Sequence, residues 1–281
     1  MIDRGCGLET RTARNTPVKS HQYAVLTAVA LSAVLSAATG ATAAQNDREG
    51  QAAADAAPTP RLPNGKPDLS GVWTVPYVPD MSRNGRNQKG QPDLPFTREG
   101  QKNFSSNDPA NGDYTGSCLP FGLVRSMNAP YPLQIIQNVK YMGVLWEQSN
   151  WFHVIPTDGR ATPSDPNPQW FGTSIGHWDG DTLVVETSGF NGYTRLDTAG
   201  HPHSDALKVR QTFTRPDANR IVYTITIDDP KMYTRPWSNE RTFVPSKGEL
   251  IEYSCEENNK SLWEGRIKPW TPPWASDAKR P

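Results

Sequence analysis

The chain has 281 residues, and its 29 lysines and arginines are balanced by 29 aspartates and glutamates, giving zero formal net charge. This balance offers no positive excess for a nucleic-acid backbone or an anionic membrane surface, so we expect neither as a partner. The 26 prolines exclude a helical bundle or a coiled coil, because proline breaks the interior of a helix.

Residues 1–44 have the pattern of a secretory signal peptide. Basic residues precede an apolar run over residues 23–38, and Ala41-Thr42-Ala43 offers the small residues of a cleavage site. The run is shorter than the ~20 apolar residues that a membrane-spanning helix needs. We therefore expect a periplasmic or secreted protein with no integral membrane segment after cleavage. An uncleaved anchor is the alternative.

Cleavage would leave two cysteines, Cys118 and Cys255. In an oxidising compartment two distant cysteines of one domain can pair, and a disulfide is one expectation. Two separate buried thiols are the other.

Residues 45–67 are rich in alanine, aspartate and proline and are expected to form a flexible lead-in. A single domain should then cover residues 68–268, followed by a tail over 269–281. Its first strand is expected around Gly71-Val72-Trp73, and a short helix should begin near Phe96 with Thr97 as its cap. Residues 105–132 are punctuated by proline and glycine and are expected to form loops.

From residue 133 the pattern is that of short strands. Asp179-Gly180 is a strong two-residue hairpin signal, because both positions tolerate a positive φ. Apolar residues also alternate with polar ones over 206–214 and 221–227. Together the expected strands cover 133–137, 140–147, 151–155, 173–178, 182–187, 206–214, 221–227, 241–244 and 250–255.

Successive hairpins with one apolar face must close on themselves or stack on a second sheet to protect their edges. We predict an all-β fold, an antiparallel up-and-down barrel of the lipocalin-like kind with long N-terminal loops. A β-sandwich is the alternative. An outer-membrane barrel is disfavoured, because the alternate faces carry Lys208 and Arg210 rather than lipid-facing apolar groups.

Gly71-Val72-Trp73 resembles the Gly-x-Trp start of lipocalin-like (calycin) barrels. In that group the tryptophan plugs the closed end and an arginine from the final strand packs across it. The resemblance implies that Arg266 takes that part here.

A second resemblance covers residues 95–260. The segment 174–185 (Ser-Ile-Gly-His-Trp-Asp-Gly-Asp-Thr-Leu-Val-Val), the segment 202–207 (Pro-His-Ser-Asp-Ala-Leu) and Thr226-Ile227-Asp228-Asp229-Pro230 with Thr234-Arg235-Pro236-Trp237 carry it. The chain resembles a large, uncharacterised family of secreted bacterial proteins with these motifs, which implies no reaction. Members often follow Asp-Gly-Arg with Pro-His, whereas here Asp158-Gly159-Arg160 is followed by Ala161. A site that relies on a histidine there would be absent.

The chain carries no glycine-rich phosphate loop, nucleophile elbow or His-Glu-x-x-His motif, and we expect no cofactor. The densest polar cluster is the segment 201–205. His203 is the candidate acid or base, with Asp205 to orient it and His177 as a second proton donor, because the pKa of histidine lies near neutral pH. The alternative is that His203 and Asp205 cap a turn by bonding nearby backbone.

His201 and His203 are two residues apart, so they can face one way in an extended segment and share a metal. The spacing lacks a defined third ligand, and we expect no metal site.

Candidate ligand-binding residues have charged or aromatic side chains at strand ends and in loops. Aromatic rims stack on planar rings, and guanidinium or phenol groups stabilise negative charge. These candidates are Arg125, Tyr131, Trp146, Glu147, Tyr233 and Arg235.

Three functions remain open. The first is an enzyme that uses acid–base chemistry, as a lyase, isomerase or hydrolase, on a small hydroxylated or aromatic compound. The second is a non-catalytic small-molecule binding protein of the lipocalin type, and the third is an envelope protein whose aromatic loops bind glycan or protein. Convergence of His203, His177 and Arg235 on one cavity would favour the enzyme.

Overall fold

The computed structural model describes residues 57–108 and 113–267. The chain divides into two units, 1–55 and 56–281, and every described residue belongs to the second. The predicted signal peptide and the C-terminal tail therefore lie outside the described residues. Among the residues that are described, no helix is long and apolar enough to cross a bilayer.

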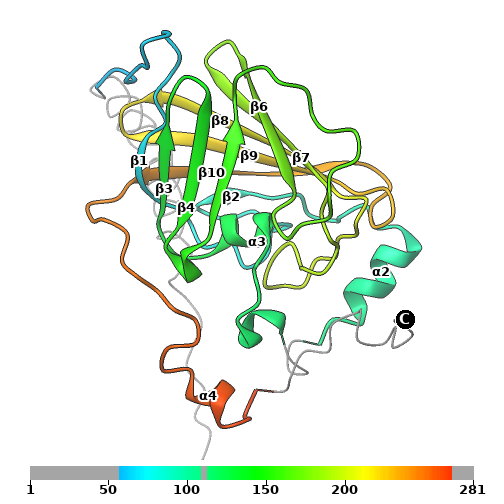
Figure 1. Ribbon diagram of the computed structural model, residues 1–281. Coiled ribbons are helices and arrows are strands. Elements are labelled where there is room, and N and C mark those ends of the chain that lie inside the picture. The colour runs from blue at the N-terminus through cyan, green and yellow to red at the C-terminus, as the bar shows by residue number, and fades with distance from the viewer. Residues whose placement is uncertain (1–56, 109–112, 268–281) are drawn as a thin grey trace, which may run out of the picture. The chain divides into compact units, whose positions relative to one another are not determined.

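In the described part of the chain, ten strands form one antiparallel sheet that curls into a nearly closed barrel, with β3 and β4 in front of β8 and β9 in Figure 1. Around the wall the order is β5-β4-β3-β1-β10-β9-β8-β7-β6, and the short β2 pairs with β10 outside this path. The prediction of an all-β, lipocalin-like barrel is thereby confirmed. The strands are β1 (Gly71–Thr74), β2 (Gln88–Lys89), β3 (Leu133–Gln137), β4 (Tyr141–Trp146), β5 (Phe152–Pro156), β6 (Thr173–Asp179), β7 (Thr182–Ser188), β8 (Lys208–Asp217), β9 (Arg220–Asp228) and β10 (Trp237–Pro245).

The predicted alternation places one row of each strand inside the barrel. Along β9, Ile221, Tyr223, Ile225 and Ile227 are all fully buried, while the residues between them are partly exposed. The ring of Tyr223 stacks on Phe243 of β10 at 4.9 Å between centroids. The interior is thus packed with side chains, as in other small barrels.

The wall has one seam, between β5 and β6. Each of these strands pairs with a single neighbour, β4 and β7 respectively, and no backbone ladder joins them among the described residues. The two strands still pack closely, because Gly176 has no side chain: a Cβ there would lie 2.9 Å from Cγ2 of Thr157 and 3.4 Å from Cγ2 of Ile155.

Within residues 57–108 and 113–267, three short α-helices accompany the barrel: α2 (Arg98–Ser105), α3 (Leu123–Asn128) and α4 (Lys260–Trp263). The expected start of α2 is confirmed, since Thr97 Oγ1 accepts a hydrogen bond from the amide of Gly100 at 2.9 Å. The loop expected over 105–132 instead contains α3, all of whose residues are buried. A helix buried on every side has no amphipathic period, so its pattern is not visible in the sequence.

The arginine that packs across Trp73 is Arg215, and the expectation for Arg266 was wrong. The guanidinium carbon of Arg215 lies 4.9 Å from the centroid of the indole ring, and its Nη1 donates to the carbonyl of Asp68. Arg266 instead follows α4, where it is exposed and pairs with Glu264 at 2.6 Å. The chain leaves the barrel after β10, so residue 266 does not belong to the last strand.

The segment 250–255, predicted as a strand, forms no strand. It is an arm that runs past the 3₁₀ turn Gln148–Asn150, where Glu147 Oε2 accepts from the amide of Ile251 at 3.1 Å. The arm is anchored by a disulfide between Cys118 and Cys255, which confirms that prediction. Asn150 adds a hydrogen bond from its side-chain amide to the carbonyl of Tyr253 at 2.8 Å, so side-chain bonds and the disulfide hold the arm in place of a strand ladder.

The part of the lead-in that is described packs against the barrel. Arg61 pairs with Asp181 at 2.6 Å, and the amide of Leu62 donates to the carbonyl of Lys66 to close a turn. Packed structure therefore begins before Asp68, where the sequence predicted its start.

We predict that Gly100→Ala will lower the free energy of unfolding by ~1–3 kcal/mol, because a Cβ there would overlap the carbonyl of Met232. Unfolding in guanidinium chloride, followed by tryptophan fluorescence, measures this change in free energy. Gly248→Ala is the matched control, since a Cβ there meets nothing within 4 Å. Equal stabilities of the two variants would show that α2 is not held at this contact.

Candidate functional site

His203, the predicted acid or base, is buried and both of its ring nitrogens are engaged. Nε2 lies 2.5 Å from Thr194 Oγ1, and Nδ1 lies 3.1 Å from the carbonyl oxygen of Ser204. Because a carbonyl only accepts, Nδ1 carries the hydrogen and Nε2 accepts from the threonine. Burial lowers the pKa of His203, which favours the neutral ring.

The predicted partners of His203 lie elsewhere. Asp205 is exposed and pairs with Lys231 at 2.6 Å, and His177 is exposed on β6. Arg235 is exposed as well. The structure therefore does not gather His203, Asp205 and His177, and none of the cavities described below is lined by them or by Arg235.

The two sequence motifs around residues 204 and 229 bind each other. The carboxylate of Asp229, which is 1% exposed, accepts from the amide of Ser204 at 2.5 Å and from its hydroxyl at 2.9 Å. Lys231 adds the surface pair with Asp205. His203 bonds the neighbouring carbonyl, as the turn alternative expected, but the carboxylate that holds the turn is Asp229 and not Asp205.

His201 belongs to a buried cluster with Asp80 and Asp197, whose ligand-type atoms all lie within 4.8 Å of one another. Asp197 Oδ2 accepts from His201 Nδ1 at 2.7 Å and from the amide of Met81 at 2.8 Å. Asp80 Oδ1 accepts from Ser82, and its Oδ2 pairs with an arginine. These hydrogen bonds connect the loop at 80–82 to the loop at 197–201, so the cluster has a structural role. His203 is not a member of this cluster.

Of the predicted ligand-binding residues, two are held in the body of the protein. Arg125 of α3 pairs with Asp113 at 2.9 Å and lines a small cavity of about 210 Å³. Tyr233 is buried and donates its hydroxyl to the carbonyl of Pro202 at 2.9 Å. Tyr131 is half-buried with its ring 5.7 Å from that of Tyr253.

Trp146 and Glu147 line a cavity of about 360 Å³ between the end of β4 and the arm that carries residues 250–252. Trp151 and Phe152 also line it. These last two side chains are shared with a larger cavity, so the predicted pair borders the candidate site described next.

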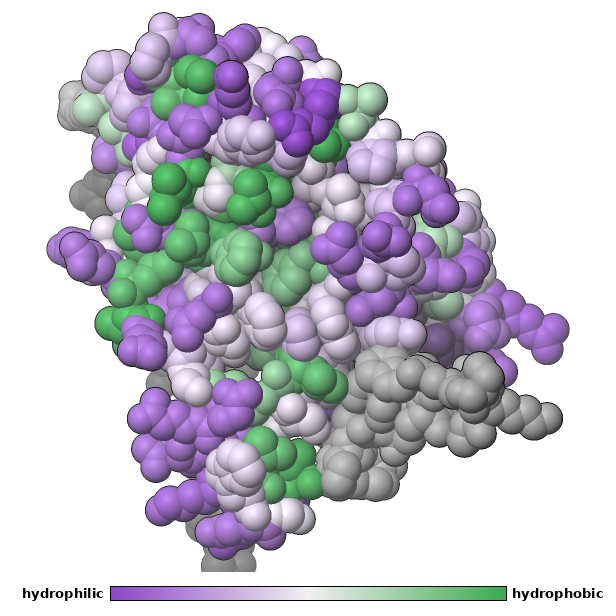
Figure 2. All heavy atoms as spheres, in the orientation of Figure 1, coloured by the Kyte–Doolittle hydropathy of each residue, from purple (hydrophilic) through white to green (hydrophobic). Residues whose placement is uncertain are grey.

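The larger cavity, of about 700 Å³, lies over the seam between β5 and β6 and under the loop that connects them. Its lining combines aromatic side chains with two inward-facing polar groups. Figure 2 shows apolar side chains gathered over the neighbouring face of β3, β4 and β5, where Phe152 and Val154 of the lining are exposed. The aromatic members are Trp151, Phe152, Trp170 and Phe171, and the polar pair is His153 and Ser174.

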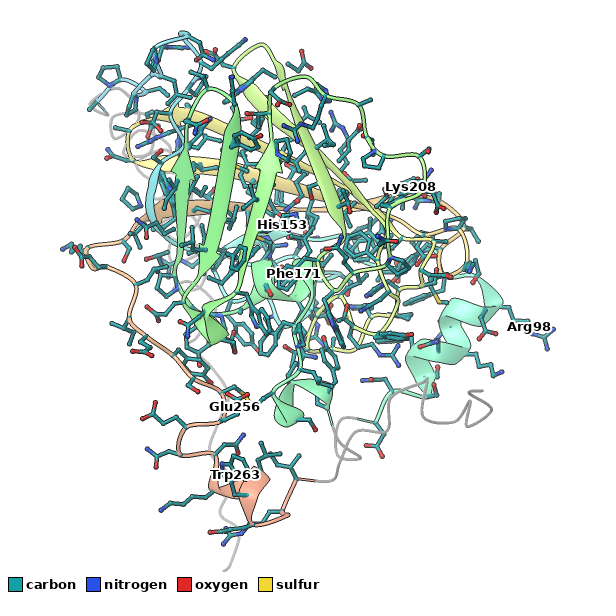
Figure 3. The ribbon with its side chains drawn as sticks, in the orientation of Figure 1. Arg98, His153, Phe171, Lys208, Glu256 and Trp263 are labelled. Atoms are coloured by element: carbon teal, nitrogen blue, oxygen red, sulfur yellow. A yellow bond between two sulfur atoms is a disulfide. The ribbon has the colours of Figure 1, made fainter. Side chains whose placement is uncertain are left out.

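Phe171 is the centre of the aromatic group. Its ring centroid lies 5.4 Å from that of Trp146, 6.0 Å from Trp151 and 6.1 Å from the imidazole of His153. Figure 3 shows Phe171 beside His153 at the barrel wall. The rings of Trp151 and His153 therefore both contact that of Phe171 at the cavity lining.

A chain of three side chains crosses the seam behind these rings. His153 Nε2 of β5 lies 2.7 Å from Ser174 Oγ of β6, which lies 2.6 Å from Thr187 Oγ1 of β7. All three residues are buried. This chain is the polar link between the two strands that no backbone ladder joins.

Burial lowers the pKa of His153 to about 4. The His153 imidazole of the unfolded chain is protonated as the pH falls below 6.5, whereas that of the folded chain stays neutral until about pH 4. The free energy of unfolding therefore decreases as the pH falls through this range. At neutral pH the imidazole is uncharged and carries one N–H.

Sequence reasoning missed His153 and Ser174. A signal existed: in the strand expected over 151–155, alternation places His153 in the same row as Ile155, where a polar side chain needs a partner. The pairing of Ser174 with Thr187 across one hairpin was likewise implied by the turn at Asp179-Gly180. That β5 and β6 face each other follows only from the closure of the barrel.

The chain matches no protein-family model and no curated protein sequence.

Proposed function

We propose that this protein binds a small aromatic molecule in the cavity at the β5–β6 seam. The observation that carries the proposal is the composition of this cavity, where aromatic rings surround a buried histidine and serine. Its volume of about 700 Å³ falls in the range of small-molecule sites. Apolar pockets with a few fixed polar groups are the usual form of such sites.

This proposed function is small-molecule binding by a β-barrel, as in the lipocalin-type alternative. The proposed ligand site lies outside the barrel wall rather than in the barrel interior. Tyr223, Phe213 and Phe243 fill the barrel interior, so the ligand occupies a hollow over the wall.

We also propose an exported location, as the leader over residues 1–44 predicts. The disulfide between Cys118 and Cys255 supports it, since such bridges persist in oxidising compartments.

Acid–base catalysis on a small hydroxylated or aromatic compound is the second candidate. The observation in its favour is the contact between His153 Nε2 and Ser174 Oγ in the same cavity. A histidine with a pKa of about 4 is a weak general base at neutral pH, so this candidate ranks below binding. Turnover of an aromatic ester that Ser174→Ala abolishes would reverse the order.

We predict that 2-acetylnaphthalene and its hydrocarbon isostere 2-isopropenylnaphthalene bind the wild-type chain, and that Ala161→Trp weakens both at least about tenfold. Ala161 is an exposed residue of the cavity lining, so an indole there would fill the hollow. Titration followed by the tryptophan indole 1H–15N resonances measures the affinities.

Ala57→Trp is the control, because residue 57 is exposed and does not line the cavity. Absence of binding by either compound, or equal affinities for the two variants, would rule out the seam cavity as the ligand site.

A further inference from the structure

We propose that the seam cavity selects aromatic carbonyl compounds, with Nδ1–H of His153 donating a hydrogen bond to the carbonyl oxygen. This inference rests on the proposed function and names the chemistry that distinguishes one aromatic guest from another.

The direction of the hydrogen bonds follows from counting donors. Ser174 Oγ is the partner of Thr187 Oγ1 within the described residues, and no other hydrogen bond reaches that threonine hydroxyl. The threonine hydrogen is therefore satisfied only if it points to Ser174 Oγ. Ser174 then donates its own hydrogen to His153 Nε2, which must accept.

The hydrogen of the neutral imidazole is thereby placed on Nδ1. Among the described residues Nδ1 has no hydrogen-bond partner, although His153 is 9% exposed and lines the cavity. Nδ1 is not fully buried, so its N–H is accessible from the cavity, where water accepts from it when no ligand is bound. A ligand oxygen can replace that water while the rings of Phe171 and Trp151 hold its aromatic part, whereas a hydrocarbon that displaces the water leaves the donor unmet.

The charge of the site favours a neutral acceptor. The ionisable members of the lining are His153 and Arg160, and Arg160 is already paired with Asp158 at 2.7 Å and bonded to the Tyr141 hydroxyl at 2.8 Å. The pKa of about 4 keeps His153 uncharged at neutral pH. A carboxylate would therefore be buried without a full counter-charge, whereas a ketone, aldehyde or ester carbonyl has no such cost.

The test compares three naphthalenes of matched shape, again by titration of the tryptophan indole resonances. Wild type should bind 2-acetylnaphthalene about tenfold more tightly than 2-isopropenylnaphthalene, whose methylene group leaves the donor unmet, and more tightly than 2-naphthoate. His153→Phe should bind ketone and hydrocarbon equally. His153→Gln, which keeps an amide N–H, should retain part of the preference, and Lys208→Met, on β8 and outside the cavity lining, should behave as wild type.

A second measurement needs no ligand and no variant. Long-range 1H–15N correlation of histidine-labelled wild-type protein should show His153 with its hydrogen on Nδ1. A hydrogen on Nε2, or equal affinity of wild type for ketone and hydrocarbon, overturns the inference while leaving aromatic binding in place. Tightest binding of the carboxylate overturns it too, and failure of all three compounds to bind overturns the proposed function with it.

Discussion

Replacing Asp197 with alanine should lower the free energy of unfolding by about 3–5 kcal/mol, because several buried donors lose their acceptor at once. Its carboxylate is 0% exposed and accepts from the amides of Met81, Gly200 and His201 as well as from the His201 imidazole. Without this carboxylate, the segment 79–81 loses its side-chain hydrogen bond to the loop at 194–201.

A buried cation adds to this effect. Arg241 is 2% exposed, its guanidinium bonds Asn128 Oδ1 of α3, and burial lowers its pKa to about 10. The nearby charge of Asp197 opposes that shift and so stabilises the guanidinium. Removing the carboxylate leaves the arginine charge without that support.

Unfolding in guanidinium chloride, followed by tryptophan fluorescence, measures the change in the free energy of unfolding. Asp205→Ala is the matched control. Asp205 belongs to the same stretch of chain, but its pair with Lys231 has side chains 65% and 56% exposed. Exposed pairs contribute ~0–1 kcal/mol, so the control should stay within that range. If Asp205→Ala is as damaging as Asp197→Ala, the brace around Asp197 does not hold the loops.

Removing the disulfide should produce the second large effect. Cys118 and Cys255 are 137 residues apart, and a bridge of this length stabilises by up to about 5 kcal/mol on the chain-entropy model. The Cys118→Ser, Cys255→Ser double variant should therefore unfold at a lower urea concentration than wild type. The full effect requires that the arm stay docked when the bridge is absent.

The other anchors of the arm are hydrogen bonds to the side chains of Glu147 and Asn150, and its apolar packing is slight, because Ile251 is 68% exposed. Hydrogen exchange of the double variant shows whether the arm stays docked. Fast exchange limited to the arm, together with a loss of stability smaller than about 5 kcal/mol, means that the arm has undocked. Wild type with reductant should match the double variant. An unchanged urea midpoint together with unchanged exchange would contradict a stabilising role for the bridge.

The barrel was predictable where short-range patterns decide the structure. The strict alternation over 221–227 fixes which face of β9 is buried, and Asp179-Gly180 fixes the turn between β6 and β7. Gly71-Val72-Trp73 correctly predicted a strand with a buried tryptophan. Its arginine partner was not predictable in the same way, because which arginine reaches an indole depends on where the chain leaves the barrel.

The candidate site was less predictable, because the densest polar motifs are bonded to one another. His203, Ser204 and Asp205 looked like a reactive cluster, yet Ser204 is held by Asp229 and Asp205 by Lys231. His153 stood alone in an apolar run, and its partner Ser174 is 21 residues away. Their meeting depends on the edge that the barrel leaves unpaired, which is a property of the whole sheet.

That unpaired edge also affects how the wall deforms. Everywhere else along the sheet, parting two strands breaks a ladder of amide–carbonyl bonds, but at the seam the His153–Ser174 contact is the hydrogen bond between them in the described chain. Parting β5 from β6 therefore breaks that hydrogen bond and removes the packing of Ile155, which is 2% exposed, against Gly176. Among the described residues, this edge is therefore the place in the wall where separating two neighbouring strands breaks the fewest hydrogen bonds.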